Sequence, residues 1–578
     1  MTTRNVLKAA EAKSLKIDGW MGERIDLTWR NNLLKLDWDG DFLRPFQEKV
    51  WGDKGEYVGL GKTFEALVRF SLYTSDPNLQ ELLNRVRDKL LASQEGDGYL
   101  GTYYKERRTV SIWDIHELAY ILHGLAVDWE QVNDTRSYRA AQKLADYLVS
   151  ELSQMSLEKI GESSIAFGGD AINPELAIVG LDRAMLAWFR ITKDEKYLNF
   201  CTRYLSLPEW GLPIVQGRNG RVEGHAYSYL SHCLAQLDLY DITGDDNLLG
   251  QTKRALEFLR SGGGLVVTGT CSQSECWHSD QDGSGELGET CATAYLIRLC
   301  ARLLCKEGVA EYGDLMERSI YNALFAAQGL DGRRIRYYTP FEGPRVFWDT
   351  DIYCCPGNYR RIISELPQFV YLTGFSEVIV NLYTTSGATL TLDGGLEVGI
   401  TQETEYPSSG DIKFRISTAM PATFSLKLRI PAWCQAFAVL VNGARVQASA
   451  QDGWLELRRE WNESDMINLE MEMPWRILKG TALQKDKFAL LRGPVLFCMD
   501  PARNSMAAQN VAEFVLDANA IKSPVASHEM RAGGIECHVS GEHSCKATVL
   551  TEFVDPNGRL TYFKGASGLA GCDDELLS

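Results

Sequence analysis

Two adjacent cysteines, Cys354 and Cys355, stand in the stretch Asp351-Ile-Tyr-Cys-Cys-Pro-Gly-Asn358, and Glu289-Thr-Cys291 lies about sixty residues earlier. Together they offer three thiols and one carboxylate, a ligand set that suits one soft divalent metal ion. Zinc takes thiolate sulfur at about 2.3 Å and carboxylate oxygen at about 2.0–2.2 Å in tetrahedral geometry, and thiolate-rich sets select it over magnesium or calcium. A metal-bound thiol is a thiolate at neutral pH, and a thiolate is a nucleophile.

The same residues allow other interpretations. Cysteine is among the residue types most often buried, so spacing alone also fits ordinary core thiols. The adjacent pair could form a strained vicinal disulfide. Four protein ligands are typical of a closed structural zinc site, whereas catalytic zinc keeps one position open. Spacing alone therefore leaves a core, a structural and a catalytic role open.

Size and composition limit the classes of protein. The chain has 578 residues, too many for one core, which predicts two to four domains. The net charge of −17 argues against nucleic acid or an anionic membrane as a partner. The N-terminus lacks the apolar segment of a signal peptide, and no apolar run is long enough to span a membrane. Fourteen irregularly spaced cysteines do not resemble a secreted disulfide framework, so we expect a cytoplasmic protein, monomeric or homo-oligomeric.

Helical periodicity dominates the chain from about residue 59 to 372. The expected helices form pairs, with one further helix at the end: 61–73 with 79–91, 114–131 with 135–153, 175–191 with 194–206, 226–242 with 246–261, 289–305 with 309–328, and 357–372. Stacked helix pairs form either an open solenoid or a closed α/α toroid. The closed form is favoured because the loops on one side collect His, Trp, Tyr, Cys and acidic residues, as a central pocket requires.

Strand patterns flank this helical region. A short alternating stretch at 20–27 predicts a strand before the helices. After about residue 375, alternating segments punctuated by Gly, Pro, Asn and Asp predict a β-sandwich, with a tight hairpin turn at Asn442-Gly443. We expect a helical catalytic domain with an N-terminal β segment (1–374), a β-sandwich (375–482) and a smaller, mostly β C-terminal domain (483–578).

Short motifs in one order across nearly the whole chain resemble the β-L-arabinofuranosidases of glycoside hydrolase family 127. They are Asp97-Gly-Tyr-Leu100, Thr102-Tyr103, His116-Glu-Leu with His123, Gly224-His225-Ala226, Glu289-Thr-Cys-Ala-Thr293, Glu317-Arg-Ser-Ile-Tyr-Asn-Ala-Leu324, Cys354-Cys-Pro-Gly357, Leu428-Arg-Ile-Pro-Ala-Trp433 and Leu491-Arg-Gly-Pro494. The resemblance implies an (α/α)6 barrel followed by β-sandwich domains. It also implies a zinc ion held by Glu289, Cys291, Cys354 and Cys355.

The resemblance assigns roles to further residues. Cys354 would be the nucleophile of a two-step retaining reaction while remaining a zinc ligand. Glu275, in Ser274-Glu-Cys-Trp-His278, best matches the family's general acid and base, and Glu286 is its rival. The resemblance also implies that the sugar would be contacted by His116, His225, Tyr337 and Tyr338.

Two points bear on these assignments. His123, like His116 and His225, is expected at a helix start facing the pocket, where it could equally be structural. The family often has one more pocket histidine opening the helix at 175–191, and here Ile178 or Asn173 stands nearest to that position. This departure bears on which sugar is bound.

The leading functional hypothesis is a zinc-dependent retaining glycosidase that releases β-L-arabinofuranose or a related sugar from short glycosides. One alternative is an α/α-barrel sugar epimerase or lyase working through histidines, which has no use for the three cysteines. Another is a carbohydrate-binding zinc protein without turnover.

Overall fold

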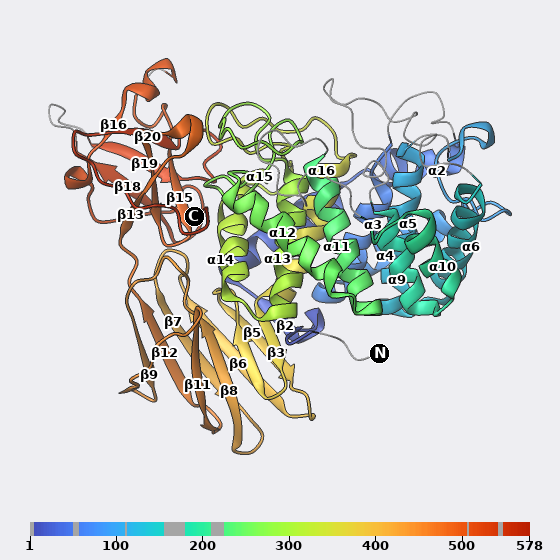
Figure 1. The fold of residues 1–578 in the computed structure, drawn as a ribbon, viewed down its shortest axis with the longest axis horizontal. Helices are drawn as coiled ribbons and strands as arrows, with labels where there is room; N and C mark the ends of the chain where they lie inside the picture. The colour runs from blue at the N-terminus through green and yellow to red at the C-terminus, as the bar shows by residue number, and fades with distance from the viewer. Residues whose placement is uncertain are drawn as a thin grey trace.

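The computed structural model describes residues 5–577 except 50–56, 110–111, 155–179, 210–224, 506–507 and 541–546. Figure 1 shows a helical body with two β regions on one side, the longer strands below and the C-terminal strands above. In the described part of the chain, no helix combines the length and the hydropathy needed to cross a membrane.

Six helices form an inner ring of the helical body. Each packs against the next, and the last packs against the first, so the ring closes. In order they are α3 (Leu60–Thr74), α5 (Ile112–Val132), α9 (Leu181–Thr192), α11 (Ala226–Thr243), α13 (Thr290–Glu307) and α16 (Cys354–Glu365). This closed ring confirms the prediction of an α/α barrel rather than an open solenoid.

An outer layer of helices covers the ring. Each outer helix packs against the inner helix that precedes it in the chain. The outer helices are α4 (Pro77–Ala92), α6 (Thr135–Leu152), α10 (Glu195–Asn199), α12 (Asp246–Ser261) and α14 (Ala310–Ser319). Because each pair is antiparallel, all six inner helices point the same way and their N-termini share one end of the barrel.

Most of these helix pairs are joined by the same kind of short turn. The inner helix ends on a residue with positive φ, such as Ser75 (52°) or Gly244 (76°). The next residue is an aspartate whose carboxylate accepts N–H groups of the outer helix, as Asp76 does from Asn78 and Leu79 at 2.9 and 3.2 Å. Such a cap stabilises a helix by about 1 kcal/mol. Two-residue turns of this kind force neighbouring helices to run antiparallel.

The expected strand at 20–27 is wrong, because this segment is helix α1 (Gly19–Leu27). Trp20, Met21 and Ile25 are buried on one side of it, and Trp20 stacks on Tyr321 at 5.4 Å between ring centroids. Packing against the barrel therefore decides the conformation over local alternation. The N-terminal strands lie earlier, at β1 (Lys8–Ala9) and β2 (Leu15–Ile17).

Two facing sheets form the β-sandwich. The first has the strand order β1, β3 (Tyr371–Gly374), β4 (Glu377–Val380), β8 (Ala422–Arg429) and β11 (Trp454–Trp461). The second has the order β10 (Ala444–Arg445), β9 (Phe437–Val441), β12 (Met466–Met471), β7 (Asp411–Ser417), β6 (Glu397–Thr404), β5 (Ser386–Thr391) and β2. Asn442 and Gly443 both have positive φ and join β9 to β10, which confirms the predicted hairpin turn.

A third sheet ends the chain. Its central strands are β14 (Lys487–Arg492), β15 (Val495–Met499) and β19 (Thr548–Glu552), with β13 (Trp475–Lys479) paired to β14. The remaining strands are β16 (Val515–Leu516), β17 (Val525–Ser527), β18 (Gly534–Val539) and β20 (Tyr562–Gly565).

Buried polar contacts join the β regions to the barrel. Arg429 of the sandwich donates to Glu317 of α14 at 2.7 Å, and both side chains are buried. Asn322, shortly after α14, donates to the Pro494 carbonyl and accepts from the Leu496 N–H, both at 2.9 Å. These residues come from the motifs at 317–324, 428–433 and 491–494, so those motifs hold the domains together.

Candidate active site

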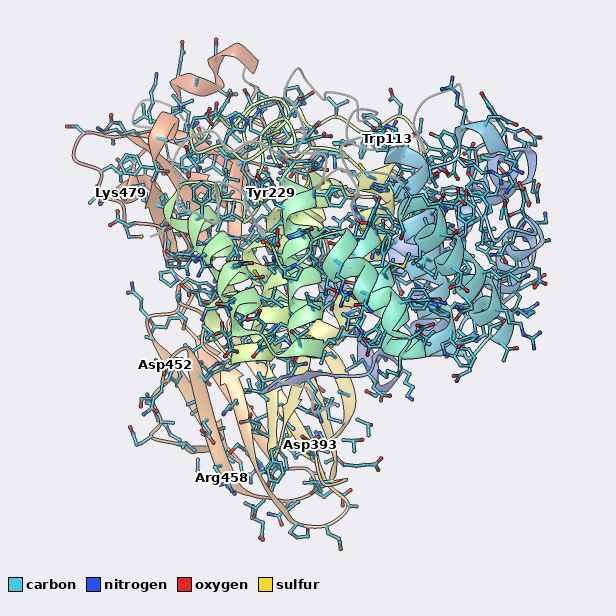
Figure 2. The ribbon with its side chains drawn as sticks, turned by 45° about the vertical axis from the view of Figure 1, so that its right-hand side comes forward. Trp113, Tyr229, Asp393, Asp452, Arg458 and Lys479 are labelled. Carbon is cyan, nitrogen blue, oxygen red and sulfur yellow. The ribbon has the colours of Figure 1, made fainter. Side chains whose placement is uncertain are left out.

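The chemistry-bearing residues gather at the end of the barrel where the inner helices begin. Cys354 is the first residue of α16, Cys291 the second of α13, and His225 directly precedes α11. Figure 2 labels Trp113 and Tyr229, on the first turns of α5 and α11, at this same upper end. Residues far apart in the chain meet here because the inner helices all run in one direction.

Glu289, Cys291, Cys354 and Cys355 form one buried cluster. Their ligand atoms all lie within 4.8 Å of one another. The sulfurs of Cys291 and Cys355 are 3.2 Å apart, and the Cys355 sulfur is 3.7 Å from Glu289 Oε1. All three thiols are free, so the adjacent cysteines form no vicinal disulfide. The structure thus brings together the four residues whose spacing suggested a metal ion.

The donor set fits a divalent cation of the zinc type. Glu289 is fully buried, and its Oε2 has no hydrogen-bond partner among the described residues. Burial raises the pKa of Glu289 to about 8. A buried carboxylate beside three thiols is costly unless a cation compensates its charge. Three sulfurs and one oxygen within this distance match the ligand types and count of a tetrahedral zinc site.

The protein's own groups already favour a thiolate at Cys354. Burial opposes its ionisation, but hydrogen bonds from the Cys291 and Cys355 thiols outweigh that effect and bring the pKa of Cys354 well below its usual value. The Lys62 ammonium and the Tyr337 hydroxyl lower it further. Burial raises the pKa of Cys291 and Cys355 well above normal. The N-terminus of α16 also favours negative charge at Cys354.

Tyr337 connects Cys354 with Glu275. The Tyr337 hydroxyl lies 3.3 Å from the Cys354 sulfur and also donates to Glu275 Oε1. One hydroxyl therefore bridges the Glu275 carboxylate and the Cys354 sulfur. Retaining glycosidases likewise hold their two reacting groups close together, at about 5–5.5 Å. Tyr338 donates to the same carboxylate oxygen at 3.4 Å. A carboxylate and a thiol from distant parts of the chain therefore lie on either side of one hydroxyl.

The loop that carries Glu275 is held in a constrained conformation. Ser272, Ser274 and Glu275 all have positive φ, at 91°, 46° and 64°. The Glu275 carbonyl accepts the Ala226 N–H at 2.7 Å, which ties the loop to the start of α11. The rival acid, Glu286, is exposed, although the Ser274 N–H bonds to its carbonyl at 3.0 Å. Only Glu275 of the two contacts Tyr337.

Of the three histidines, two lie at the site. His225 Nε2 is 3.2 Å from Glu275 Oε2, and the Glu289 and Glu275 carboxylates outweigh burial and raise the pKa of His225 to about 9. Buried His116 lies 3.4 Å from the Tyr227 hydroxyl. His123 lies midway along α5 and bonds to Glu65 at 3.0 Å. The prediction that His123 sits at a helix start facing the pocket is therefore wrong.

Several residues at the site were not singled out from the sequence. Asn358 donates its side-chain N–H to the Cys291 sulfur at 3.1 Å. Lys62 is fully buried and donates to the Tyr227 hydroxyl at 3.2 Å. Asn358 could have been found, because it lies four residues after Cys354 and so on the same helix face. Lys62 gives no such signal within its apolar helix. Ile178 and Asn173 lie outside the described residues.

Comparisons with known proteins agree with this architecture. The family model described as the catalytic domain of GH127 β-L-arabinofuranosidase matches residues 16–368, and the model of the middle domain matches residues 377–473. A non-reducing end β-L-arabinofuranosidase of Bifidobacterium longum subsp. longum is 23% identical over 532 residues, covering 80% of this chain and 78% of that protein.

Solved structures share the fold. A GH127 β-arabinofuranosidase superposes with a TM-score of 0.81 at 21% identity, covering 99% of this chain and 100% of that chain. A GH127 β-L-arabinofuranosidase from Geobacillus stearothermophilus T6 gives a TM-score of 0.78 at 22% identity, with coverages of 96% and 100%.

The barrel, the sandwich and the family models define a glycoside hydrolase of the α/α-barrel class. More particularly, the chain belongs to the GH127 β-L-arabinofuranosidase family. Membership supports the hydrolase prediction over an epimerase or a binding protein without turnover.

Proposed function

We propose that the protein is a zinc-dependent retaining glycosidase with Cys354 as its nucleophile and Glu275 as its general acid and base. The observation that carries this proposal is the Tyr337 hydroxyl, which contacts both the Cys354 sulfur and Glu275. The substrate is a short glycoside with a terminal β-L-arabinofuranosyl group. This choice is supported by the similarity to the non-reducing end β-L-arabinofuranosidase of Bifidobacterium longum.

In the first step, the Cys354 thiolate attacks the anomeric carbon of the bound sugar. The glycosidic C–O bond breaks, and protonated Glu275 gives its proton to the leaving oxygen, so the aglycone departs as an alcohol. A sulfur–sugar bond now links the glycosyl group to Cys354, and Glu275 is a carboxylate.

In the second step, Glu275 takes a proton from a water molecule as its oxygen attacks the anomeric carbon. The C–S bond breaks, the thiolate returns, and Glu275 is again protonated. Two inversions at the same carbon give overall retention.

Glu289, Cys291, Cys354 and Cys355 would hold the zinc ion. When bound, zinc keeps the thiolate ionised at neutral pH and makes sulfur a better leaving group in the second step. Asn358 orients Cys291 by its N–H···S contact at 3.1 Å. Such outer hydrogen bonds fix ligand orientation in metal sites.

The sugar itself would be held by the polar side chains around the cluster. His116 and His225 both lie beside the buried Tyr227, with ring centroids 6.4 and 5.2 Å from the tyrosine ring. His225 Nδ1 is buried without a hydrogen-bond partner among the described residues. We assign His116, His225, Tyr337 and Tyr338 to contacts with sugar hydroxyls.

The test is Cys354→Ser, with Cys300→Ser as the matched control, since Cys300 is a buried α13 thiol outside the cluster. Both variants are assayed with an aryl β-L-arabinofuranoside, and zinc content is measured on the same samples. We expect Cys354→Ser to lose ~10³-fold or more in kcat with unchanged circular dichroism, and the control to keep its activity. Near wild-type turnover in Cys354→Ser would end the nucleophile assignment.

A further inference from the structure

A second cavity, of about 270 Å³, lies at the opposite end of the inner ring. Most of its lining residues lie on later turns of the inner helices than the active-site residues do. On α16, Cys354 and the cavity residue Glu365 are separated by eleven residues, about 16 Å along a helix. The space is too large for a single water, whose share of liquid volume is about 30 Å³. This cavity is therefore distinct from the glycosidase site.

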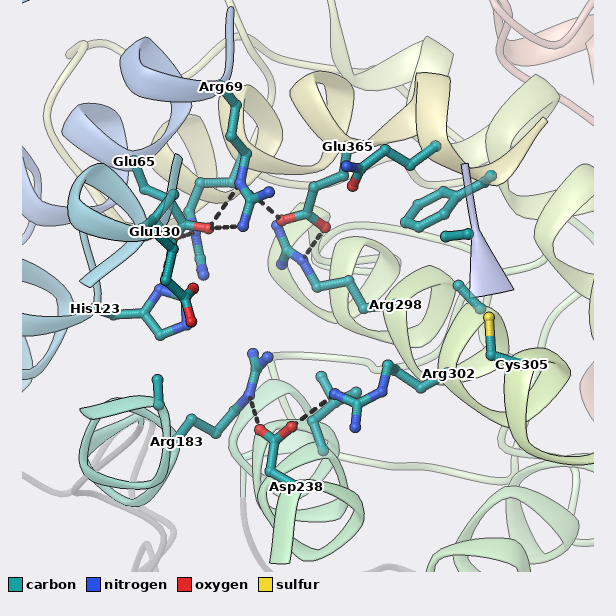
Figure 3. A pocket seen from close by; sticks show the side chains of 18 of the residues that line it. Glu65, Arg69, His123, Glu130, Arg183, Asp238, Arg298, Arg302, Cys305 and Glu365 are labelled. Atoms are coloured by element: carbon teal, nitrogen blue, oxygen red, sulfur yellow. Dashed lines mark hydrogen bonds and ion pairs between the residues drawn. The ribbon is translucent and has the colours of Figure 1, made fainter. Parts of the chain in front are cut away.

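Arginine dominates the polar lining of this cavity (Figure 3). Its lining arginines are Arg69, Arg183, Arg190, Arg298, Arg302 and Arg361. Four carboxylates oppose them, from Glu65, Glu130, Asp238 and Glu365. Since His123 in the wall has a pKa lowered by burial, it is neutral at pH 7 and leaves an excess of positive charge. Arg302 also reaches Asp241 at 2.8 Å, but that carboxylate is already paired with Lys306.

Most of the charge in the wall is internally paired. Asp238 receives Arg302 at 2.7 Å, Arg190 at 3.0 Å and Arg183 at 3.4 Å. Glu65 likewise receives two cations, Arg361 at 2.7 Å and Arg69 at 2.9 Å.

Arg298 is different. Its Nε donates to Glu365 at 2.7 Å, but neither terminal nitrogen has a hydrogen-bond partner among the described residues. The residue is only 5% exposed, and Figure 3 shows it extending from α13 towards Glu365. A guanidinium edge with two parallel N–H groups matches the two oxygens of a carboxylate. Buried charged donors without partners are rare in folded proteins, so this edge calls for an anionic partner.

Most of the remaining wall is apolar, with Gln368 and Asn381 as further polar lining residues. Small and aliphatic side chains line the space between the arginines: Ala126, Val127, Leu234, Ala301, Leu304 and Met316. A ligand for this cavity therefore combines one anionic group with a compact apolar body. A neutral furanose has neither feature, so the cavity is no subsite for the glycoside. Among the lining residues, Arg190 and Glu130 are more exposed than Arg298.

We propose that this cavity is a binding site for a small organic carboxylate, whose two oxygens pair with the terminal nitrogens of Arg298. The apolar body then lies against α5, α11 and α13. The proposal does not rest on the glycosidase mechanism, because none of the lining residues belongs to the cysteine cluster or contacts Glu275. Arg361 and Glu65 lie both in this wall and in the polar chain behind Cys291, but neither is the proposed contact of the carboxylate.

Isothermal titration of the zinc-loaded full chain with benzoate tests the proposal, with benzamide as the neutral ligand of nearly equal shape. We expect one benzoate site per chain and at least tenfold weaker binding of benzamide. Arg298→Gln should weaken benzoate binding at least tenfold. Arg458→Gln, an exposed arginine on the sandwich, should leave it unchanged.

Arg298→Lys and a crystallographic experiment cover the case in which Arg298→Gln does not fold. Arg298→Lys keeps the positive charge but cannot form a bidentate contact. Its affinity for benzoate should therefore be lower than that of the wild type, but higher than the affinity of the wild type for benzamide. Anomalous scattering from 4-bromobenzoate should give a peak beside Arg298. Absence of binding, equal binding to Arg298→Gln, or a bromine peak only at the cysteine cluster would overturn the proposal.

Discussion

Asn358 donates a side-chain N–H to the sulfur of Cys291 at 3.1 Å, and its own carbonyl oxygen accepts from Arg361 at 3.0 Å. Arg361 is in turn fixed by Glu65 at 2.7 Å. The orientation of one cluster thiol is therefore set by a buried chain of polar contacts from α3 through α16 to α13. In metal sites, outer hydrogen bonds of this kind orient the ligand.

Replacing Asn358 by Ala should weaken zinc binding by ~10–100-fold, because Cys291 loses the donor that orients it. Competition against a chromophoric chelator measures the affinity directly. Asn78→Ala, an exposed asparagine on α4, is the control and should bind zinc as the wild type does. An unchanged zinc affinity in Asn358→Ala would show that the N–H···S contact has no role in the metal site.

Tyr337→Phe should reduce kcat by ~10–100-fold, because the hydroxyl that contacts both Cys354 and Glu275 is lost. Tyr338→Phe is the comparison variant, because the Tyr338 hydroxyl also reaches Glu275, at 3.4 Å, whereas among the described contacts it is the Tyr337 hydroxyl that also reaches Cys354. Steady-state kinetics with an aryl glycoside measures kcat for both variants. Equal losses in both variants would argue against a special position of Tyr337 between acid and nucleophile.

Glu275→Gln should slow glycosides with poor leaving groups by ~10²–10⁴-fold and activated aryl glycosides less in the first step, because only poor leaving groups need a proton. The measurement is the dependence of kcat/KM on leaving-group pKa. Glu286→Gln, which alters an exposed side chain of the same loop region, should keep the wild-type dependence. If Glu286→Gln gives the steeper dependence instead, the acid has been assigned to the wrong residue.

Acid should destabilise the barrel partly through Asp238. Burial opposes its ionisation, but Arg302, Arg190 and Arg183 hold the pKa of Asp238 far below the ordinary 3.8. As pH falls through about 4, the unfolded chain takes up a proton at this position while the folded chain does not, so stability is lost. Asp238→Asn should have a lower melting temperature at pH 7 and a smaller further decrease between pH 5 and 3.5. If the melting temperatures of the wild type and of Asp238→Asn decrease equally between pH 5 and 3.5, this role of Asp238 is contradicted.

Much of the fold could be predicted from the sequence, because helix periodicity and turn chemistry act locally. The predicted helix 226–242 corresponds to α11 (Ala226–Thr243), and the turns of most pairs are readable as a positive-φ residue followed by a capping aspartate, as at Gly244 and Asp245. The helix at 19–27 could not be predicted in this way. Its conformation depends on packing of Trp20 against Tyr321, three hundred residues away.

The site was partly predictable for a different reason. Cysteine, histidine and acidic residues in long loops can be recognised from their residue types as possible metal ligands or catalytic groups. The cluster and Glu275 could therefore be proposed from motifs. Lys62 and Tyr227 could not, because a lysine and a tyrosine within apolar helices look like any amphipathic position. His123 was misassigned because spacing alone does not tell which end of the barrel a helix position faces. It pairs with Glu65 in the wall of the second cavity.

The central claim is that sulfur of Cys354 bonds to the sugar during turnover. Glu275→Gln with a dinitrophenyl β-L-arabinofuranoside tests it most directly, because this leaving group needs no acid while the second step lacks its base. Peptide mass spectrometry of the quenched reaction should find one pentosyl group on the peptide that carries Cys354. A burst of dinitrophenol with the pentosyl group on another residue, or with no covalent label, would contradict the mechanism.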